Sequence, residues 1–139
     1  MIIVDDHSKK SCRPKVNIDI PYTIIRNKRN HGPGYSRQRG IQYAKNDYVL
    51  FMDSDDEFVS PEAFAYYIDG IKENADIIYA KYILIEGSLQ IRHSYHPDIW
   101  GQCIKKEFLH KYNIKFMDYI YGEDFLFSVH MYNKANKFY

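Results

Sequence analysis

The stretch YVLFMDSDDEF, residues 48–58, determines which fold this sequence predicts. Its first five residues are apolar or aromatic on both faces of an extended chain, a pattern typical of a buried strand in a parallel sheet. The run then ends in four carboxylates, at Asp53, Asp55, Asp56 and Glu57. Neighbouring carboxylates repel one another and lose solvation where a strand end is covered, so their crowding calls for a ligand.

Strands and helices alternate around this stretch. The β-branched and aromatic runs at residues 2–4 and 22–26 predict two strands, and a helix is expected over residues 35–45. After the acidic stretch, Ser60, Pro61 and Glu62 are typical of a helix start, and Phe64, Ile68 and Ile71 form an apolar stripe on that helix.

The second half predicts a hairpin and two more helices. Apolar runs at residues 77–86 and 90–95 flank Gly87 and Ser88, a pattern that indicates a hairpin. Helices are expected at residues 102–111 and from Gly122 onward, the last with Phe125, Val129 and Tyr132 on one face. The order of elements predicts an α/β fold with a mostly parallel sheet.

Size and charge restrict the class of protein. At 139 residues the chain is expected to be one domain, and its formal net charge of +1 argues against a general nucleic-acid binder. No apolar run is long enough to cross a bilayer, so we expect a soluble, cytoplasmic protein without a transmembrane segment. Cys12 and Cys103 have no CxxC partner and are interpreted as buried or incidental thiols.

Two acidic clusters follow predicted strands. Asp5 and Asp6 come after the first strand, and the Asp53 cluster comes after the third. Carboxyl ends of parallel strands meet at one edge of a sheet, where open α/β folds bind their ligands. Carboxylates suit Mg²⁺ or Mn²⁺ together with a substrate phosphate, although a solvated acidic loop is the alternative. An EF-hand is excluded, because the twelfth position counted from Asp53 is Phe64 rather than Glu.

Two further segments could contribute to such a site. The turn HGPGYSRQRG, residues 31–40, could bring backbone N–H groups to an anion, with Arg37 or Arg39 adding charge-assisted bonds; an ordinary glycine turn is the alternative. Glu123 and Asp124 open the last predicted helix, where acids stabilise the helix dipole and where one could also serve as a general base.

Together these pieces resemble the family 2 glycosyltransferases of GT-A fold, which transfer a sugar from a nucleotide donor. The matching segments occur in order, and the second is the most specific: IIVDDHS, NHGPGYSRQRGIQYAKNDYVLFMDSDDEFVSP, WGQCIKKEFLHKYNIKF and YGEDFLF. The resemblance implies a Rossmann-like, nucleotide-diphospho-sugar transferase sheet flanked by helices. It also implies a metal-assisted, inverting transfer to an acceptor hydroxyl, with a UDP-sugar as the commonest donor.

The resemblance assigns a role to each matching residue. Asp6, with Asp5 beside it, would bind the base, and Arg37 would lie near the nucleotide or its diphosphate. Asp124 would be the catalytic base, supported by Glu123. Asp53, Asp55 and Asp56 form the DxD-type motif, which would contact the ribose and, through Mn²⁺ or Mg²⁺, the diphosphate. Either Asp55 or Asp56 would be the direct metal ligand.

The resemblance also implies a division of the chain into two parts, and the sequence departs from the family pattern in one respect. Residues 1–60 would form the donor-binding part and residues 61–139 the acceptor and catalytic part of a single domain. Family members carry another strand and helix before the strand at residues 2–4, so we expect a domain truncated at its N-terminus: a fragment, a minimised natural relative, or a chain that supplies the missing strand another way. An unfilled sheet position exposes backbone groups, and we therefore expect strand rearrangement or association with another chain, including a homo-oligomer through the exposed edge.

Two other functions remain open from the sequence. A response-regulator receiver domain also has an Asp pair after one strand and an Asp after a later strand. Against it, residues 9–21 contain two prolines where a helix should follow, and no Lys-Pro pair occurs in the chain. The second is a non-catalytic or weakly active GT-A remnant that binds metal and nucleotide.

Overall fold

The computed structural model describes residues 1–10, 12, 20–58, 60–80, 82–86, 88–92, 99–117 and 122–139. In this part of the chain the strands are β1 (Ile2–Asp5), β2 (Thr23–Arg26), β3 (Tyr48–Leu50), β4 (Ile77–Tyr79), β5 (Tyr82–Glu86), β6 (Ser88–Arg92) and β7 (Gln102–Lys105). The helices are α1 (Pro33–Tyr43), α2 (Glu62–Lys72), α3 (Lys106–Lys111) and α4 (Glu123–Tyr132).

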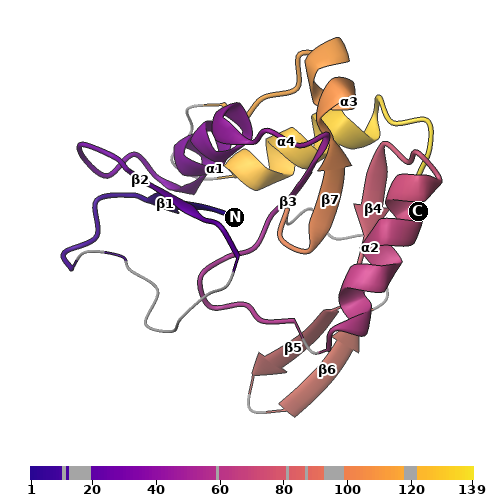
Figure 1. Cartoon of the computed structure of the whole chain (residues 1–139), viewed down its shortest axis with the longest axis horizontal. Helices are drawn as coiled ribbons and strands as arrows, with labels where there is room; N and C mark the ends of the chain where they lie inside the picture. The colour runs from indigo at the N-terminus through magenta and orange to yellow at the C-terminus, as the bar shows by residue number, and fades with distance from the viewer. Residues whose placement is uncertain are drawn as a thin grey trace.

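The described strands form three sheets (Figure 1). β1 and β2 are parallel, with Ile2 opposite Thr23 and Asp5 opposite Arg26. In the second sheet β7 lies between β3 and β4 and is antiparallel to both, so that β3 and β4 run in the same direction. β5 and β6 form the predicted hairpin; Gly87, expected in its turn, lies outside the described residues.

Two expectations about the central sheet were wrong in detail. Residues 102–111 were expected to be a helix, but the first four form β7 and only the remainder, α3, is helical. β3 was expected to be a parallel strand, whereas its hydrogen-bonded partner is the antiparallel β7. β7 is short and buried and runs directly into α3, so it shows no period-2 pattern of its own, and an apolar run like that of β3 indicates burial but not the direction of its partner strand.

The central sheet is packed on both faces, as the apolar pattern predicts. Ile77 of β4 and Ile104 of β7 lie in one hydrophobic cluster, which includes buried residues of α3 and α4. Their chain neighbours, Ile78 of β4 and Cys103 of β7, belong to a second cluster with Tyr67 of α2. Alternate side chains of a strand point to opposite faces, so α2 covers one face of the sheet while α3 and α4 cover the other. Burial raises the pKa of the Cys103 thiol to about 11, so the thiol is held in its neutral form.

The helices turn different faces toward the core from those that the sequence suggested. The stripe on α2 is exposed, at 48% for Phe64, 51% for Ile68 and 39% for Ile71. The residues that α2 buries are Tyr67 and Gly70. A Cβ on Gly70 would lie 2.7 Å from Ile78 Cγ1, so glycine permits the close approach of α2 to β4.

α4 shows the same difference. Its buried residues are Glu123, Phe127, Ser128 and Met131, whereas Phe125 and Val129 of the predicted apolar face are exposed. The helix therefore directs a carboxylate, Glu123, inward at its first turn.

β1 and β3 belong to separate sheets. Among the described residues, no backbone hydrogen bond joins these two strands. Association with another chain through this edge stays a prediction. Within the described part of the chain, no helix has the length and apolar character needed to cross a membrane.

Candidate active site

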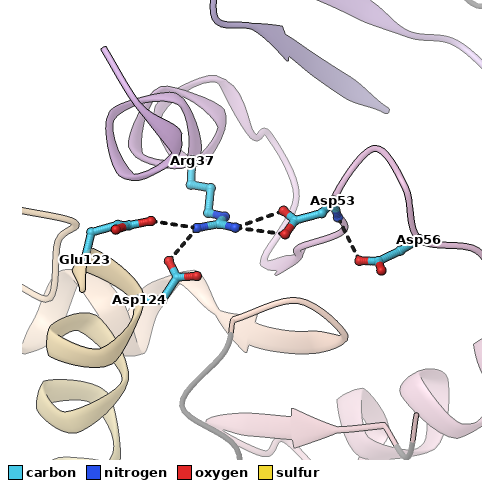
Figure 2. Close-up of polar contacts among 5 residues, drawn as sticks. All are labelled: Arg37, Asp53, Asp56, Glu123 and Asp124. Carbon is cyan, nitrogen blue, oxygen red and sulfur yellow. Dashed lines mark hydrogen bonds and ion pairs between the residues drawn. The ribbon is translucent and has the colours of Figure 1, made fainter. Parts of the chain in front are cut away.

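Arg37 connects three carboxylates that come from distant parts of the sequence (Figure 2). Its Nη2 donates to both oxygens of Asp53, at 2.9 and 3.1 Å, just after β3. Its Nη1 donates to Asp124 Oδ1 and lies 3.4 Å from Glu123 Oε1, both in the first turn of α4. The fold thus brings together four of the residues that the sequence singled out.

This network is shielded on one side and open on the other. The side chains of Arg37 and Glu123 are 13% and 10% exposed, and that of Asp124 is 21% exposed. The Asp53 side chain is 40% exposed, which leaves this end of the network accessible to a ligand. Charge-assisted bonds of this kind are strong where water is largely excluded.

The segment after β3 forms a tight turn. The Asp56 N–H donates to the Asp53 carbonyl at 3.2 Å, and the Asp53 N–H donates to Asp56 Oδ2 at 3.1 Å. Asp53 faces Arg37, whereas Asp55 and Asp56 are exposed. The predicted crowding of carboxylates is therefore relieved in two ways, by the Arg37 ion pair and by exposure to solvent.

α1 and α4 approach each other closely where Glu123 joins the Arg37 network. A Cβ on Gly34 would lie 2.8 Å from Glu123 Cγ, so only glycine permits this approach of α1 to α4. Phe116 stacks on Phe127 of α4 with ring centroids 4.0 Å apart, and the Phe51 ring lies edge-on to both. Because Phe51 directly follows β3, this cluster ties the strand end to the helix that carries Asp124.

Asp5 and Asp6 serve different local contacts. The buried Asp5 carboxylate accepts the Ser8 N–H at 2.9 Å and pairs with Arg26. The Ser8 N–H bond is the largest reason that the pKa of Asp5 is lowered from its ordinary 3.8, and Arg26 adds to the effect against the opposing effect of burial.

The Asp6 carboxylate binds the turn that precedes α1. It accepts the Gly32 N–H at 2.6 Å, the His31 N–H at 2.9 and 3.0 Å, and Asn27 Nδ2 at 2.7 Å. Burial raises the pKa of Asp6, but these donors outweigh burial and the net shift is below 3.8. The turn was expected to bring N–H groups to an anion, and in this structure that anion is a carboxylate of the protein itself.

Asn27 is a connecting residue that the sequence reasoning missed. It is 2% exposed at the end of β2, and its Nδ2 donates to Asp6 Oδ1 and, at 3.0 Å, to Ser36 Oγ. Its Oδ1 accepts from Arg39, which was expected near an anion and instead contacts this amide. The rule that polar residues at strand ends line a ligand site would have identified it, because Asn27 directly follows β2.

The Asp6 contacts predict a pH-dependent contribution to stability. Asp6→Asn should lower the free energy of unfolding by roughly 1–2 kcal/mol at pH 7, because charge-assisted bonds to N–H groups are lost. A carboxylate with a lowered folded-state pKa stabilises the protein above its unfolded pKa, and this stabilisation disappears as pH falls through the folded-state value. The difference from wild type should therefore shrink below pH 3.8 in urea titrations performed across pH.

Asp69→Asn provides the matched control for this experiment, because Asp69 is an exposed carboxylate on α2 paired with Lys72. It should change stability little at any pH. A difference between Asp6→Asn and wild type that stays constant from pH 7 to below 3.8 would contradict the assignment.

A metal site was also expected in the acidic segment. Within the described residues, no three His, Cys, Asp or Glu side chains are grouped so that they could hold an ion. Asp55 and Asp56 offer two exposed carboxylates in one turn. This donor set fits a Mg²⁺ or Mn²⁺ ion that takes its other ligands from water and substrate phosphate, as these ions commonly do.

Solved structures share this arrangement of elements. TarS from S. aureus, residues 1–349 in complex with UDP, superposes with a TM-score of 0.82 at 23% identity, over 99% of this chain and 46% of that one. The structure of the same TarS segment in complex with UDP-GlcNAc superposes with a TM-score of 0.80 at 23% identity, over 99% of this chain and 45% of that one. The mixed α/β architecture is therefore that of the GT-A fold, and this chain spans less than half of each of those chains.

Sequence comparison identifies the family. The sequence profile of glycosyl transferase family 2 matches residues 1–133, and the chain belongs to this family. An uncharacterized glycosyltransferase of Haemophilus influenzae (strain ATCC 51907 / DSM 11121 / KW20 / Rd) is 39% identical over 77 residues, which span 55% of this chain and 26% of that protein. The resemblance seen in the motifs is confirmed, and the receiver-domain alternative is excluded.

Proposed function

We propose that this chain binds a UDP-sugar and transfers its sugar, with inversion, to an acceptor hydroxyl. The observation that carries the proposal is the Arg37 network, which places the candidate base Asp124 in one ion-pair cluster with Asp53 of the DxD-type motif. The proposal is supported by the similar TarS structures, which were solved in complex with UDP and UDP-GlcNAc. This chain spans less than half of the chains in those structures, 46% and 45%.

The donor part, residues 1–60, would bind the nucleotide. Asp6, with Asp5 beside it, would accept a hydrogen bond from the base, and Asp53 would contact the ribose. Asp55 and Asp56 would hold Mn²⁺ or Mg²⁺, which when bound would neutralise charge on the diphosphate. Arg37 lies at the border of this part, within reach of both Asp53 and α4.

The acceptor part, residues 61–139, would supply the base. The Asp124 carboxylate takes the proton of the acceptor hydroxyl, and the hydroxyl oxygen forms a bond to the anomeric carbon. The bond from that carbon to the diphosphate oxygen breaks on the opposite face, and UDP leaves with the electron pair. Glu123 supports Asp124 by sharing the Arg37 guanidinium. Such a reaction suits the cytoplasm, where we expect the protein to act.

Titration of the folded wild-type protein with UDP tests this function. We expect calorimetry to show binding that strengthens when Mn²⁺ is added, followed by release of sugar from UDP-GlcNAc used as a probe donor. A folded protein that binds no UDP with or without Mn²⁺ would contradict the proposal. Binding without sugar release or transfer would instead support the second candidate, a remnant that keeps the fold without catalysis.

A further inference from the structure

The guanidinium of Arg37 bridges the segment after β3 and the first turn of α4 (Figure 2). Its Nη2 forms a two-pronged contact with Asp53 on the donor side, and its Nη1 contacts Asp124 Oδ1 on the acceptor side. The side chain is only 13% exposed, so these contacts are not those of a mobile surface arginine. Three carboxylates share this one cation.

We propose that Arg37 is a positioning residue for the base Asp124. The inference rests on the proposed function, in which Asp124 takes the proton of the acceptor hydroxyl. The Arg37 contact with Oδ1 constrains the plane of the Asp124 carboxylate, and so helps to determine how its oxygens are directed at the acceptor. This role differs from the diphosphate contact that the family resemblance implies for Arg37.

The contact with Asp53 holds Arg37 itself in place. Because Nη2 bonds Asp53 while Nη1 bonds Asp124, the guanidinium plane is fixed from two sides, which a lysine, as a single point charge, cannot reproduce. Asp53 is held in turn by the hydrogen bonds that close the turn to Asp56. The orientation of the base is thereby linked to the donor-binding segment after β3.

The packing of α1 on α4 does not depend on the guanidinium. Gly34 of α1 lies close to the Glu123 side chain, and Phe127 of α4 stacks on Phe116. Removing the Arg37 side chain should therefore remove one contact that orients Asp124 without unfolding the protein. Small misplacements of a reacting group are sufficient to reduce catalysis, by about 100-fold for a shift near 1 Å.

The experiment compares Arg37→Ala and Arg37→Lys with wild type and with Lys72→Ala, which removes an exposed ion pair on α2. The readouts are the UDP dissociation constant with Mn²⁺, the rate of UDP-GlcNAc hydrolysis and the melting temperature. Both Arg37 variants should lose about 100-fold in kcat while the UDP dissociation constant changes by no more than about threefold. Lys72→Ala should match wild type in both binding and rate.

Chemical rescue separates positioning from general structural damage. Guanidinium ion, at a concentration too low to shift the melting temperature, should restore the rate of Arg37→Ala by about tenfold or more, since it can occupy the vacated place. It should not restore a variant that also carries Asp124→Asn. A correctly folded Arg37→Ala protein that guanidinium does not rescue would overturn the proposal.

Two other outcomes would also overturn it. An unchanged rate in Arg37→Ala would show that Asp124 needs no anchor. A loss of UDP affinity in proportion to the loss of rate would show that Arg37 binds the donor instead. Wild-type protein that fails to bind UDP contradicts the proposed function itself, and this inference with it, so that titration is performed first.

Discussion

Replacing Asp124 with Asn is expected to abolish sugar transfer while leaving UDP binding intact. The amide cannot accept the proton of the acceptor hydroxyl, and loss of a general base typically reduces the rate about 10²–10⁴-fold. Asn is close to Asp in shape, and its amide oxygen can still accept a hydrogen bond from Arg37 Nη1. The nucleotide contacts assigned to Asp6 and Asp53 are unaffected, so the UDP dissociation constant should stay within about threefold of wild type.

The rate of UDP-GlcNAc hydrolysis and the calorimetric affinity for UDP are measured on the same preparation. Asp69→Asn is the matched control, because it makes the same chemical change on an exposed carboxylate of α2. It should leave both quantities unchanged. If Asp124→Asn hydrolyses the donor as fast as wild type, the base lies elsewhere, and Glu123, which is also in contact with Arg37, becomes the next residue to test.

The sequence predicted the strand ends around the candidate site better than the contacts between its residues. β1 ends at Asp5, one residue beyond the strand expected at residues 2–4, and the acidic turn follows shortly after the strand that begins at Tyr48. Both could be anticipated because apolar runs that stop at acidic residues are local features of the sequence. The pairing of Arg37 with Asp124, 87 residues away, is a tertiary contact that no local pattern encodes.

The errors on helix faces have a common physical origin. On α2 the stripe of Phe64, Ile68 and Ile71 is the more apolar side, yet the helix buries Tyr67 and Gly70 instead. A Gly70 that permits close approach to β4 outweighs the hydrophobic pattern, because packing against a sheet depends on shape as well as on apolar area. Periodicity alone does not contain this steric information.

The turn before α1 was predicted to bind an anion through its N–H groups, and the anion that it binds is a carboxylate of the protein itself. Glycine and the helix start do place the N–H groups of His31 and Gly32 around an anion, and that anion is the Asp6 carboxylate. Asp6 and the turn are separated by 25 residues, so only the parallel pairing of β1 with β2 brings them together. A uracil that uses Asp6 would have to share its oxygens with these donors, which makes the turn before α1 part of the base pocket in our proposal.

Replacing both Asp55 and Asp56 with Ala is expected to remove the effect of Mn²⁺ on UDP binding. These two exposed carboxylates are the proposed metal ligands, and a cation held between them and a diphosphate contributes to donor affinity. In wild type the UDP affinity should rise on addition of Mn²⁺, whereas in the double variant it should be independent of Mn²⁺ and about 100-fold lower at saturating metal. Calorimetry with and without Mn²⁺ measures both quantities.

A double variant of equal charge change, Asp47→Ala with Asp69→Ala, separates a metal site from a general loss of negative charge. Asp47 is exposed just before β3, at the opposite end of the strand from the acidic turn, and Asp69 lies on α2. This control should retain the Mn²⁺ effect.

The single variants then distinguish the two ligands: Asp56 Oδ2 already closes the turn to the Asp53 N–H, so we expect Asp55→Ala to reproduce most of the loss. A double variant of Asp55 and Asp56 that still binds UDP more tightly with Mn²⁺ would place the metal at other residues, and a wild type whose affinity ignores Mn²⁺ would make the transfer metal-independent.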